Sequence, residues 1–262
     1  MNWSRLFTIS LFLILPAPVI VVVAASLSSV GYIRFPPGDL SLRWYAEFLS
    51  DQRWLDALVT SVLLALVGAV VTTTVSVMAA LAVARKSSRW SALFEATVLA
   101  PLIFPHAALG MAMVALAATF HVYGTFAGLV LTHCIVTLPF AYRPIAASLR
   151  KLDVSLEEAA MSLGSRPWNT FFTVVLPMIR PGIVTSLLFS FIISFDEVTI
   201  TMFLVGPEVT TLPVAIYSYI QESGKPVVAA ISSALVATTL LFVLILERFV
   251  GLELFVEAER VR

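Results

Sequence analysis

Long stretches almost free of charged residues constrain this sequence more than any other feature. Six of them reach the ~20 residues of helix that cross the ~30 Å hydrocarbon core of a bilayer. Inside a bilayer no water is present to bind backbone amides and carbonyls, so a spanning segment must satisfy its own hydrogen bonds, which favours helices. The sequence therefore predicts an all-α membrane protein with six transmembrane helices, at residues 6–33, 57–84, 96–120, 122–142, 182–205 and 227–246.

Pairs of prolines interrupt two of these stretches. Pro16 and Pro18 lie in the first stretch, and Pro101 and Pro105 lie in the third. A proline inside a helix removes a backbone hydrogen bond and clashes with the preceding turn. We therefore expect a kink or a break at both places.

The composition supports a membrane protein and excludes several other classes. Apolar residues make up 60% of the 262 residues and charged residues 12%, whereas soluble domains average about 25% charged residues. A formal net charge of zero provides no cationic surface for a nucleic acid. The single cysteine, Cys134, excludes a disulfide framework. No metal site is expected, because no two of the three histidines are three or four residues apart.

Basic residues are unevenly distributed among the segments that connect the predicted helices. With the N-terminus assigned to the cytoplasm, twelve of the sixteen Lys and Arg residues fall on the cytoplasmic side and four fall outside. Cytoplasmic segments next to transmembrane helices carry an excess of Lys and Arg. We therefore expect both termini to be cytoplasmic. We also expect a single transmembrane domain over residues 1–262, with a first helix at about 6–33, core helices within about 57–246 and a long cytoplasmic loop at 143–181.

The loop at 143–181 carries the pattern of a short, capped helix. Ser155 and Glu158 have the spacing of a capping box, in which each side chain bonds the backbone amide of the other residue. Gly164 suits the left-handed residue that ends a helix, and Pro167 prevents continuation. Two turns of helix are unstable alone in water, so the segment must dock either on its own membrane domain or on a cytoplasmic partner. Between the two signals, four residues share one apolar helical face: Leu156, Ala159, Ala160 and Leu163.

The same loop resembles a signature of the inner-membrane permeases of bacterial ABC importers. That signature reads Glu-Ala-Ala, three residues, Gly, nine residues, Ile, one residue and Leu-Pro. This sequence keeps every interval and has Val174 in place of the isoleucine; the matching positions are Glu158, Ala159, Ala160, Gly164, Leu176 and Pro177. The resemblance implies the type I ABC importer permease fold and a location in the bacterial inner membrane.

In that family the short helix is a coupling helix that docks into a groove on an ATP-hydrolysing subunit. The resemblance implies that Glu158, Ala159, Ala160 and Gly164 form this coupling element and that Leu176-Pro177 sets the angle into the membrane. The implied partners are a dimer of ATP-binding subunits, a second permease subunit in a heterodimer, a periplasmic or lipid-anchored solute-binding protein and membrane lipid. The chain itself has no Gly-Lys-Ser/Thr phosphate-binding loop. We therefore expect no cofactor and no enzyme activity here, with ATP and Mg held by the partner subunits.

Two further segments, at 138–143 and 194–199, look like the polyamine branch of these importers, and residues 206–218 continue the likeness. The chain is similar to the second permease subunit of spermidine/putrescine transporters, which implies import of a polyamine from periplasm to cytoplasm. Related branches use the same machinery for other small solutes, such as an amino-phosphonate, another amine or an oxyanion. A secondary transporter driven by an ion gradient and a membrane-embedded enzyme are remote alternatives, because both leave the loop signature unexplained.

Asp196 and Glu197 are exceptional because they lie inside the fifth apolar stretch. Ionisable groups at such depth are costly, and they usually mark a water-filled path or a partner. On a continuous helix, one narrow stripe would hold Glu197 with Ser186, Ser190, Ser194 and Thr201, with Asp196 at its edge. The alternative is that both acids lie near the membrane interface and pair with a basic residue or a helix end. We expect five residues to line the substrate pathway and to suit ammonium groups: Glu197, Asp196, Ser190, Ser194 and Thr201.

Three other side chains have two open interpretations each. His106 either bonds a backbone carbonyl that the Pro101–Pro105 pair leaves free or lines the path. Tyr217 and Tyr219 either offer their aromatic faces to a cation or anchor a lateral helix at the membrane interface.

Overall fold

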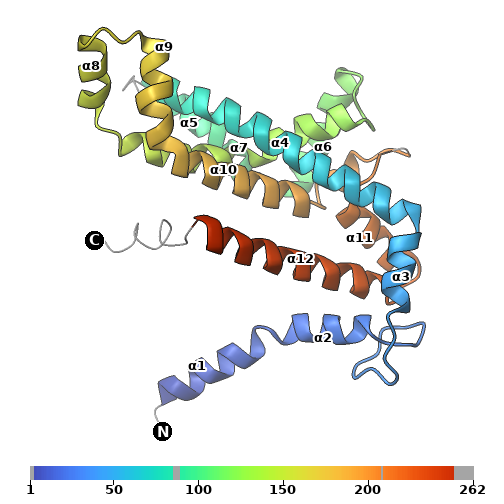
Figure 1. The fold of residues 1–262 in the computed structure, drawn as a ribbon. Coiled ribbons are helices and arrows are strands. Elements are labelled where there is room, and N and C mark those ends of the chain that lie inside the picture. Colours follow the sequence, from blue (N-terminus) through green and yellow to red (C-terminus); the bar gives the residue numbers. More distant parts are fainter. Residues whose placement is uncertain (1–2, 85–88, 208, 251–262) are drawn as a thin grey trace. The chain divides into compact units, whose positions relative to one another are not determined.

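The computed structural model describes residues 3–84, 89–207 and 209–250, and the regular structure within these ranges is helical (Figure 1). The all-α prediction is confirmed for this part of the chain. The elements in order are α1 (Trp3–Ile14), α2 (Ala17–Ser26), α3 (Arg43–Ser50), α4 (Gln52–Ala84), α5 (Arg89–Leu99), η1 (Ala100–Leu102), α6 (His106–Thr119), α7 (Phe126–Arg150), α8 (Val154–Ser162), α9 (Pro167–Thr170), η2 (Phe171–Val175), α10 (Leu176–Asp196), η3 (Thr201–Phe203), α11 (Leu212–Glu222) and α12 (Val227–Val250).

The chain divides into two compact units. The terminal unit comprises residues 1–56 and 215–262, and the central unit comprises residues 57–214. The single domain over residues 1–262 therefore stays a prediction.

A tyrosine joins three helices of the terminal unit, in which α2 packs along α12 (Figure 1). The Tyr45 hydroxyl on α3 lies 2.7 Å from Ser26 Oγ on α2, and it donates to Ser233 Oγ on α12 at 3.1 Å. The neighbouring Trp44 is fully buried and donates from Nε1 to the Ser28 carbonyl at 2.8 Å. These bonds give the polar atoms of α3 partners inside the unit and fix α3 against α2 and α12.

In the central unit, α7 and α10 form an extensive helix pair. Gly182 makes their close approach possible: a Cβ atom at this position would lie only 2.8 Å from the Pro144 carbonyl oxygen. One turn further along α10, Ser186 Oγ donates to the Ala141 carbonyl at 2.6 Å. Small residues and hydroxyl groups at helix contacts are typical of membrane bundles, where lipid removes the hydrophobic drive for association.

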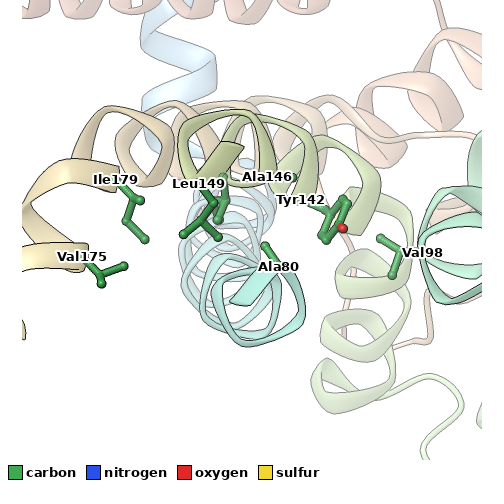
Figure 2. Close-up of a cluster of buried hydrophobic side chains, with 8 residues drawn as sticks. Ala80, Val98, Tyr142, Ala146, Leu149, Val175 and Ile179 are labelled. Atoms are coloured by element: carbon green, nitrogen blue, oxygen red, sulfur yellow. The ribbon is translucent and has the colours of Figure 1, made fainter. Parts of the chain in front are cut away.

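A buried apolar cluster joins α7 and α10 to α4, α5 and η2 (Figure 2). Tyr142 and Ile145 of α7 are its largest buried members with Ile179 of α10. Figure 2 shows Val175 and Ile179 on one side of Leu149, with Ala80 of α4 close by. The cluster therefore ties the start of α10 to the last turns of α7 and to the end of α4. Its eight members are Ala80, Val98, Tyr142, Ile145, Ala146, Leu149, Val175 and Ile179.

Three described helical segments are long and apolar enough to cross a membrane: residues 52–84, 126–150 and 167–196. A fourth span is present if α5–η1 and α6 count together, and these are bent by 107° at the break between them. This bend confirms the effect expected of Pro101 and Pro105. Among the described residues, 10–26 and 227–241 form shorter apolar helices. The six spans and the cytoplasmic termini therefore stay predictions.

Several predicted boundaries are wrong. The stretch at 6–33 is interrupted between α1 and α2 at Leu15–Pro16, as expected of its prolines, but α2 ends at Ser26 and not at residue 33. The helix expected at 182–205 ends at Asp196, because Glu197 turns to extended backbone.

The loop at 143–181 is also shorter than expected. The helix α7 continues to Arg150 in spite of Pro139 and Pro144, and a continuous helical path starts again at Pro167. Prolines are tolerated in membrane helices because neighbouring groups satisfy the freed carbonyls.

Replacing Gly182 by valine should separate α7 from α10. Overpacking of a close contact costs about 1–3 kcal/mol, so Gly182→Val should lower the melting temperature of the purified protein in detergent. Gly31→Val is the matched control, because no atom lies within 4 Å of a Cβ at Gly31. Equal melting temperatures for the two variants would show that the contact at Gly182 is not tight.

Candidate functional site

The helix of the signature loop, α8, is capped at its start by Asp153. Its Oδ1 atom accepts a hydrogen bond from the Ser155 amide at 3.0 Å, and Asp153 has the extended backbone of a capping residue. The predicted capping box of Ser155 and Glu158 is therefore wrong, since the helix begins at Val154 and Ser155 lies inside its first turn. The physical reason is that two candidate capping residues lie two positions apart and only one of them can be the N-cap. Asp153 accepts from the Ser155 amide, which places Ser155 inside the helix.

The end of α8 is closed by Gly164, as predicted. Gly164 has a φ of +92°, in the left-handed region that favours glycine. Its amide donates to the Met161 carbonyl at 2.9 Å, and the Ser165 amide donates to the Ala160 carbonyl at 3.0 Å. These two bonds are the Schellman arrangement that satisfies the last carbonyls of a helix.

The surface of α8 is open to solvent over its whole length, and none of its residues is buried. Glu158 and Ala159 are exposed, while Ala160 is half-buried. Apolar side chains are exposed beside them, with Leu163 90% and Trp168 72% accessible. The short helix contacts α9 and η2, but these contacts leave most of its apolar surface without cover.

Leu176 and Pro177 lie in the first turn of α10. They follow the π-helical turn η2 directly, and the path from residue 167 to 196 is helical throughout. Their neighbours Val175 and Ile179 are fully buried in the cluster of Figure 2. The signature positions thus connect an exposed helix, α8, to a helix start that is held in a packed core.

A second group of candidate residues surrounds a buried histidine on α7. His133 is 1% exposed. Its Nδ1 atom lies 2.7 Å from Ser194 Oγ on α10, and its Nε2 atom lies 3.0 Å from Thr201 Oγ1 on η3. Two of the predicted pathway residues, 61 and 68 positions away in sequence, therefore meet on one imidazole ring.

Glu197 lies between these two partners in sequence and has a divided environment. Its Oε1 atom accepts a hydrogen bond from the buried Ile200 amide at 2.8 Å. Its Oε2 atom lies 3.6 Å from Nδ1 of His106, whose side chain is 57% exposed. One carboxylate oxygen is thus committed to the backbone, while the other faces the accessible histidine.

The remaining predicted pathway residues differ in their surroundings. Asp196, the last residue of α10, is exposed. Ser190 is fully buried, and its hydroxyl has no hydrogen-bond partner among the described residues. Glu197 and Thr201 lie beyond the end of α10, so the continuous helical stripe predicted from the sequence is wrong for both. A fold that turns the chain at Glu197 nevertheless brings Thr201 back beside Ser194.

Sequence reasoning missed the contacts of His133 and His106. Neither histidine has a local motif, and their partners lie on elements that only the fold brings close. The structure places His106 Nδ1 3.6 Å from Glu197 Oε2, a contact that neither interpretation of His106 included. Within the described ranges, no three His, Cys, Asp or Glu side chains are grouped closely enough to hold a metal ion.

Comparisons with known proteins identify relatives over nearly the whole chain. Residues 72–252 match the family described as binding-protein-dependent transport system inner membrane component. The chain is 32% identical to the putrescine transport system permease protein PotI of Escherichia coli (strain K12), over 99% of this chain and 93% of PotI. It is 24% identical to the spermidine/putrescine transport system permease protein PotC of the same strain, over 91% of this chain and 90% of PotC.

A solved structure shares the fold. It is described as a bacterial ABC transporter involved in the import of the acidic polysaccharide alginate. The match has a TM-score of 0.72 at 17% identity, and it covers 95% of this chain and 98% of that chain. A match of this quality over both full lengths shows that the helices follow an ABC transporter permease fold.

Removing the Asp153 carboxylate should loosen the first turn of α8. Asp153→Ala leaves the Ser155 amide without an acceptor, so hydrogen exchange in a peptide covering α8 should become faster. Asp153→Asn keeps a capping oxygen and should exchange like the unaltered protein. Mass spectrometry of the purified protein gives the rates; identical rates in all three proteins would rule out the cap.

The same cap should respond to acid. The hydrogen bond from the Ser155 backbone amide holds the pKa of Asp153 below its ordinary value. A lowered pKa means that the cap contributes fully above the unfolded pKa of about 3.9 and is lost as the pH falls through the folded pKa. Protection of the α8 amides against hydrogen exchange should therefore be constant down to about pH 5 and weaken below it. In Asp153→Asn, which has no carboxylate at this position, the protection should not show this weakening.

Proposed function

Since the chain belongs to the family of binding-protein-dependent transport system inner membrane components, and is therefore the permease subunit of an ABC importer, we propose that it moves a polyamine such as putrescine or spermidine into the cytoplasm. Two relatives named for putrescine and for spermidine/putrescine transport support this cargo. A polyamine is a flexible chain with an ammonium group at each end. It needs carboxylates that replace water around the charge without forming a closed cage.

The observation that carries this proposal is the divided environment of Glu197. Its Oε1 atom is held by the Ile200 amide, which fixes the carboxylate in one orientation. Its Oε2 atom faces His106, whose side chain is half-exposed and whose Nδ1 atom lies 3.6 Å away. An ammonium group arriving from the accessible side replaces His106 as the partner of Oε2. The carboxylate is then a transient station along the path.

The other pathway residues act around this station. Asp196 is exposed and adjacent in sequence, and it provides a second carboxylate for the other end of the cargo. The hydroxyl groups of Ser194 and Thr201 bond the His133 ring, so in this proposal they hold the segment that carries Glu197 in place. Ser190 lies one turn before Ser194 and brings a buried hydroxyl with no described partner.

Energy for transport comes from outside the chain in this proposal. ABC importer permeases work with ATP-binding subunits and a solute-binding protein, and α8 is the element that docks on a dimer of such ATPases. The exposed apolar side chains of Val154 on α8 and of Leu163 directly after it are buried against the partner. Glu158, Ala159, Ala160 and Gly164 form the coupling element, and Leu176 and Pro177 pass its displacement to α10. The partner subunits bind the ATP and Mg.

The proposed topology has six spans in the bacterial inner membrane, with both termini and α8 on the cytoplasmic side. The 12:4 distribution of basic residues between the two sides supports this orientation. A second, different permease subunit completes the path, as the resemblance to polyamine importers implies. A periplasmic or lipid-anchored binding protein delivers the cargo to it.

Neutralising Glu197 should reduce polyamine uptake in the assembled transporter. Glu197→Gln keeps an oxygen for the Ile200 amide but removes the charge that attracts an ammonium group. A charge-assisted hydrogen bond is worth about 1.5–3 kcal/mol, so uptake of radiolabelled putrescine into proteoliposomes should fall roughly tenfold or more.

Asp196→Asn removes the second proposed carboxylate, and it should lose less uptake than Glu197→Gln because the Asp196 side chain is exposed. Unchanged putrescine uptake in Glu197→Gln would remove Glu197 from the path. Uptake of another small solute, but not of putrescine, by the unaltered transporter would overturn the polyamine assignment.

A second variant tests the coupling element. Valine is strained at the left-handed backbone of Gly164, whereas asparagine tolerates it. No atom lies within 4 Å of a Cβ at Gly164, so neither side chain clashes. Gly164→Val should therefore reach the membrane and lose most uptake, while Gly164→Asn keeps it. Normal uptake in Gly164→Val would contradict a coupling role for this turn.

A further inference from the structure

We propose that His133 is a positioning residue: it holds together the two sides of the helix break between α10 and η3 and thereby fixes the orientation of the Glu197 carboxylate. The inference rests on the proposed role of Glu197 in the cargo path. His133 itself is buried, with 1% of its surface exposed. Its effect on transport is exerted through other residues.

The two nitrogens of this ring bond to opposite sides of the break. Ser194, bonded at Nδ1, lies in the last turn of α10, and Thr201, bonded at Nε2, is the first residue of η3. Both partners are hydroxyl groups, which donate or accept as required. A neutral imidazole, which donates from one nitrogen and accepts at the other, satisfies both bonds at once.

The segment between the two bonds contains Glu197. After Glu197 the chain starts a new turn, in which the Met202 amide donates to the Val198 carbonyl at 2.9 Å. Glu197 caps this turn through the Ile200 amide. Because Ser194 and Thr201 are both tied to one rigid ring, the span between them is fixed. The orientation of Glu197 depends on that span.

The ring is held in place by its own surroundings. Thr137 Oγ1 donates to the His133 carbonyl at 2.7 Å, and Thr72 Oγ1 on α4 lies 3.1 Å from Thr137 Oγ1. Gly68 of α4 lies close to both partners: a Cβ atom there would lie 3.9 Å from His133 Cβ and 3.7 Å from Ser194 Oγ. The ring itself is held at both nitrogens by Ser194 and Thr201, so the imidazole acts as a spacer between them.

The contacts of His133 with Ser194 and Thr201 form a clamp between α7 and α10. This clamp lies far from the ends of the two helices that lead to α8. From His133 to the end of α7 at Arg150 there are seventeen residues, or about 25 Å of helix. The helix α10 returns from the α8 end and is joined to α7 by the Ser186–Ala141 bond. A displacement at α8 therefore reaches Glu197 through a helix pair whose far ends His133 holds together.

His133→Phe tests the clamp, because it keeps a flat ring of similar volume and removes both hydrogen bonds. The unaltered transporter, assembled with its partners, is compared with this variant for putrescine taken up per ATP hydrolysed. Because both hydrogen bonds are lost, we expect uptake per ATP to fall roughly tenfold. A residue that only fills space would lower the amount of assembled transporter and leave this ratio unchanged, which would overturn the proposal.

Hydrogen exchange separates this inference from the identity of the cargo. The Ile200 amide donates to Glu197, so its exchange should speed up in His133→Phe whatever solute the transporter carries. Slow Ile200 exchange in that variant refutes the clamp. If the Ile200 amide exchanges fast in His133→Phe but the unaltered transporter does not take up putrescine, the polyamine assignment is wrong and the positioning role of His133 is supported.

Two further variants complete the test. Thr201→Val keeps the imidazole and removes one bond, so it should give a smaller loss and remain informative if His133→Phe fails to assemble. Adding Thr201→Val to His133→Phe should cause no further loss, because the bond is already absent. His121→Asn is the matched histidine control: it is exposed at a left-handed backbone that asparagine tolerates. It should leave Ile200 exchange and uptake per ATP unchanged.

Discussion

The pairing of polar groups between α7 and α10 is the constraint on which the central unit depends. Both helices are apolar enough to cross a membrane, and a polar group left unpaired in hydrocarbon costs several kcal/mol. Ser186 donates to the Ala141 carbonyl, and His133 has a hydroxyl partner at each ring nitrogen. Sliding one helix along the other by a single turn would separate these donors from their acceptors. The bonds therefore fix the register of the pair, and Gly182 sets its close spacing.

The same requirement accounts for where α10 stops. A carboxylate in an apolar stretch must find donors, and Glu197 finds one in the Ile200 amide only after the chain leaves the helix. Its second oxygen then faces His106 on the accessible side. The opposite condition holds at α8, which has no buried residue and is held by the caps at Asp153 and Gly164. The central unit therefore contains both a packed helix pair and a short helix whose apolar side chains are exposed.

Predictions of helix ends and bends are confirmed where the backbone chemistry of glycine or proline alone requires them. Gly164 ends α8 because few other residues adopt its backbone, and Pro101 with Pro105 bends the third stretch wherever the neighbours lie. The predicted start of α8 is wrong because two capping residues lie two positions apart, and Asp153, not Ser155, is the N-cap. The helix expected to continue past Glu197 was misjudged for a different reason: hydropathy does not register a side chain that caps the following turn.

The helical class, the long apolar segments and the end of α8 at Gly164 are predictable from the sequence, because hydrophobic length and the chemistry of proline and glycine are properties of neighbouring residues. Only the tertiary structure decided how His133 meets Ser194 and Thr201, and how His106 meets Glu197. These partners are separated by more than sixty residues of chain, and no local pattern encodes a contact made when two helices pack and the chain turns back at their end. The membrane segments follow from composition, whereas the polar contacts within them follow from packing.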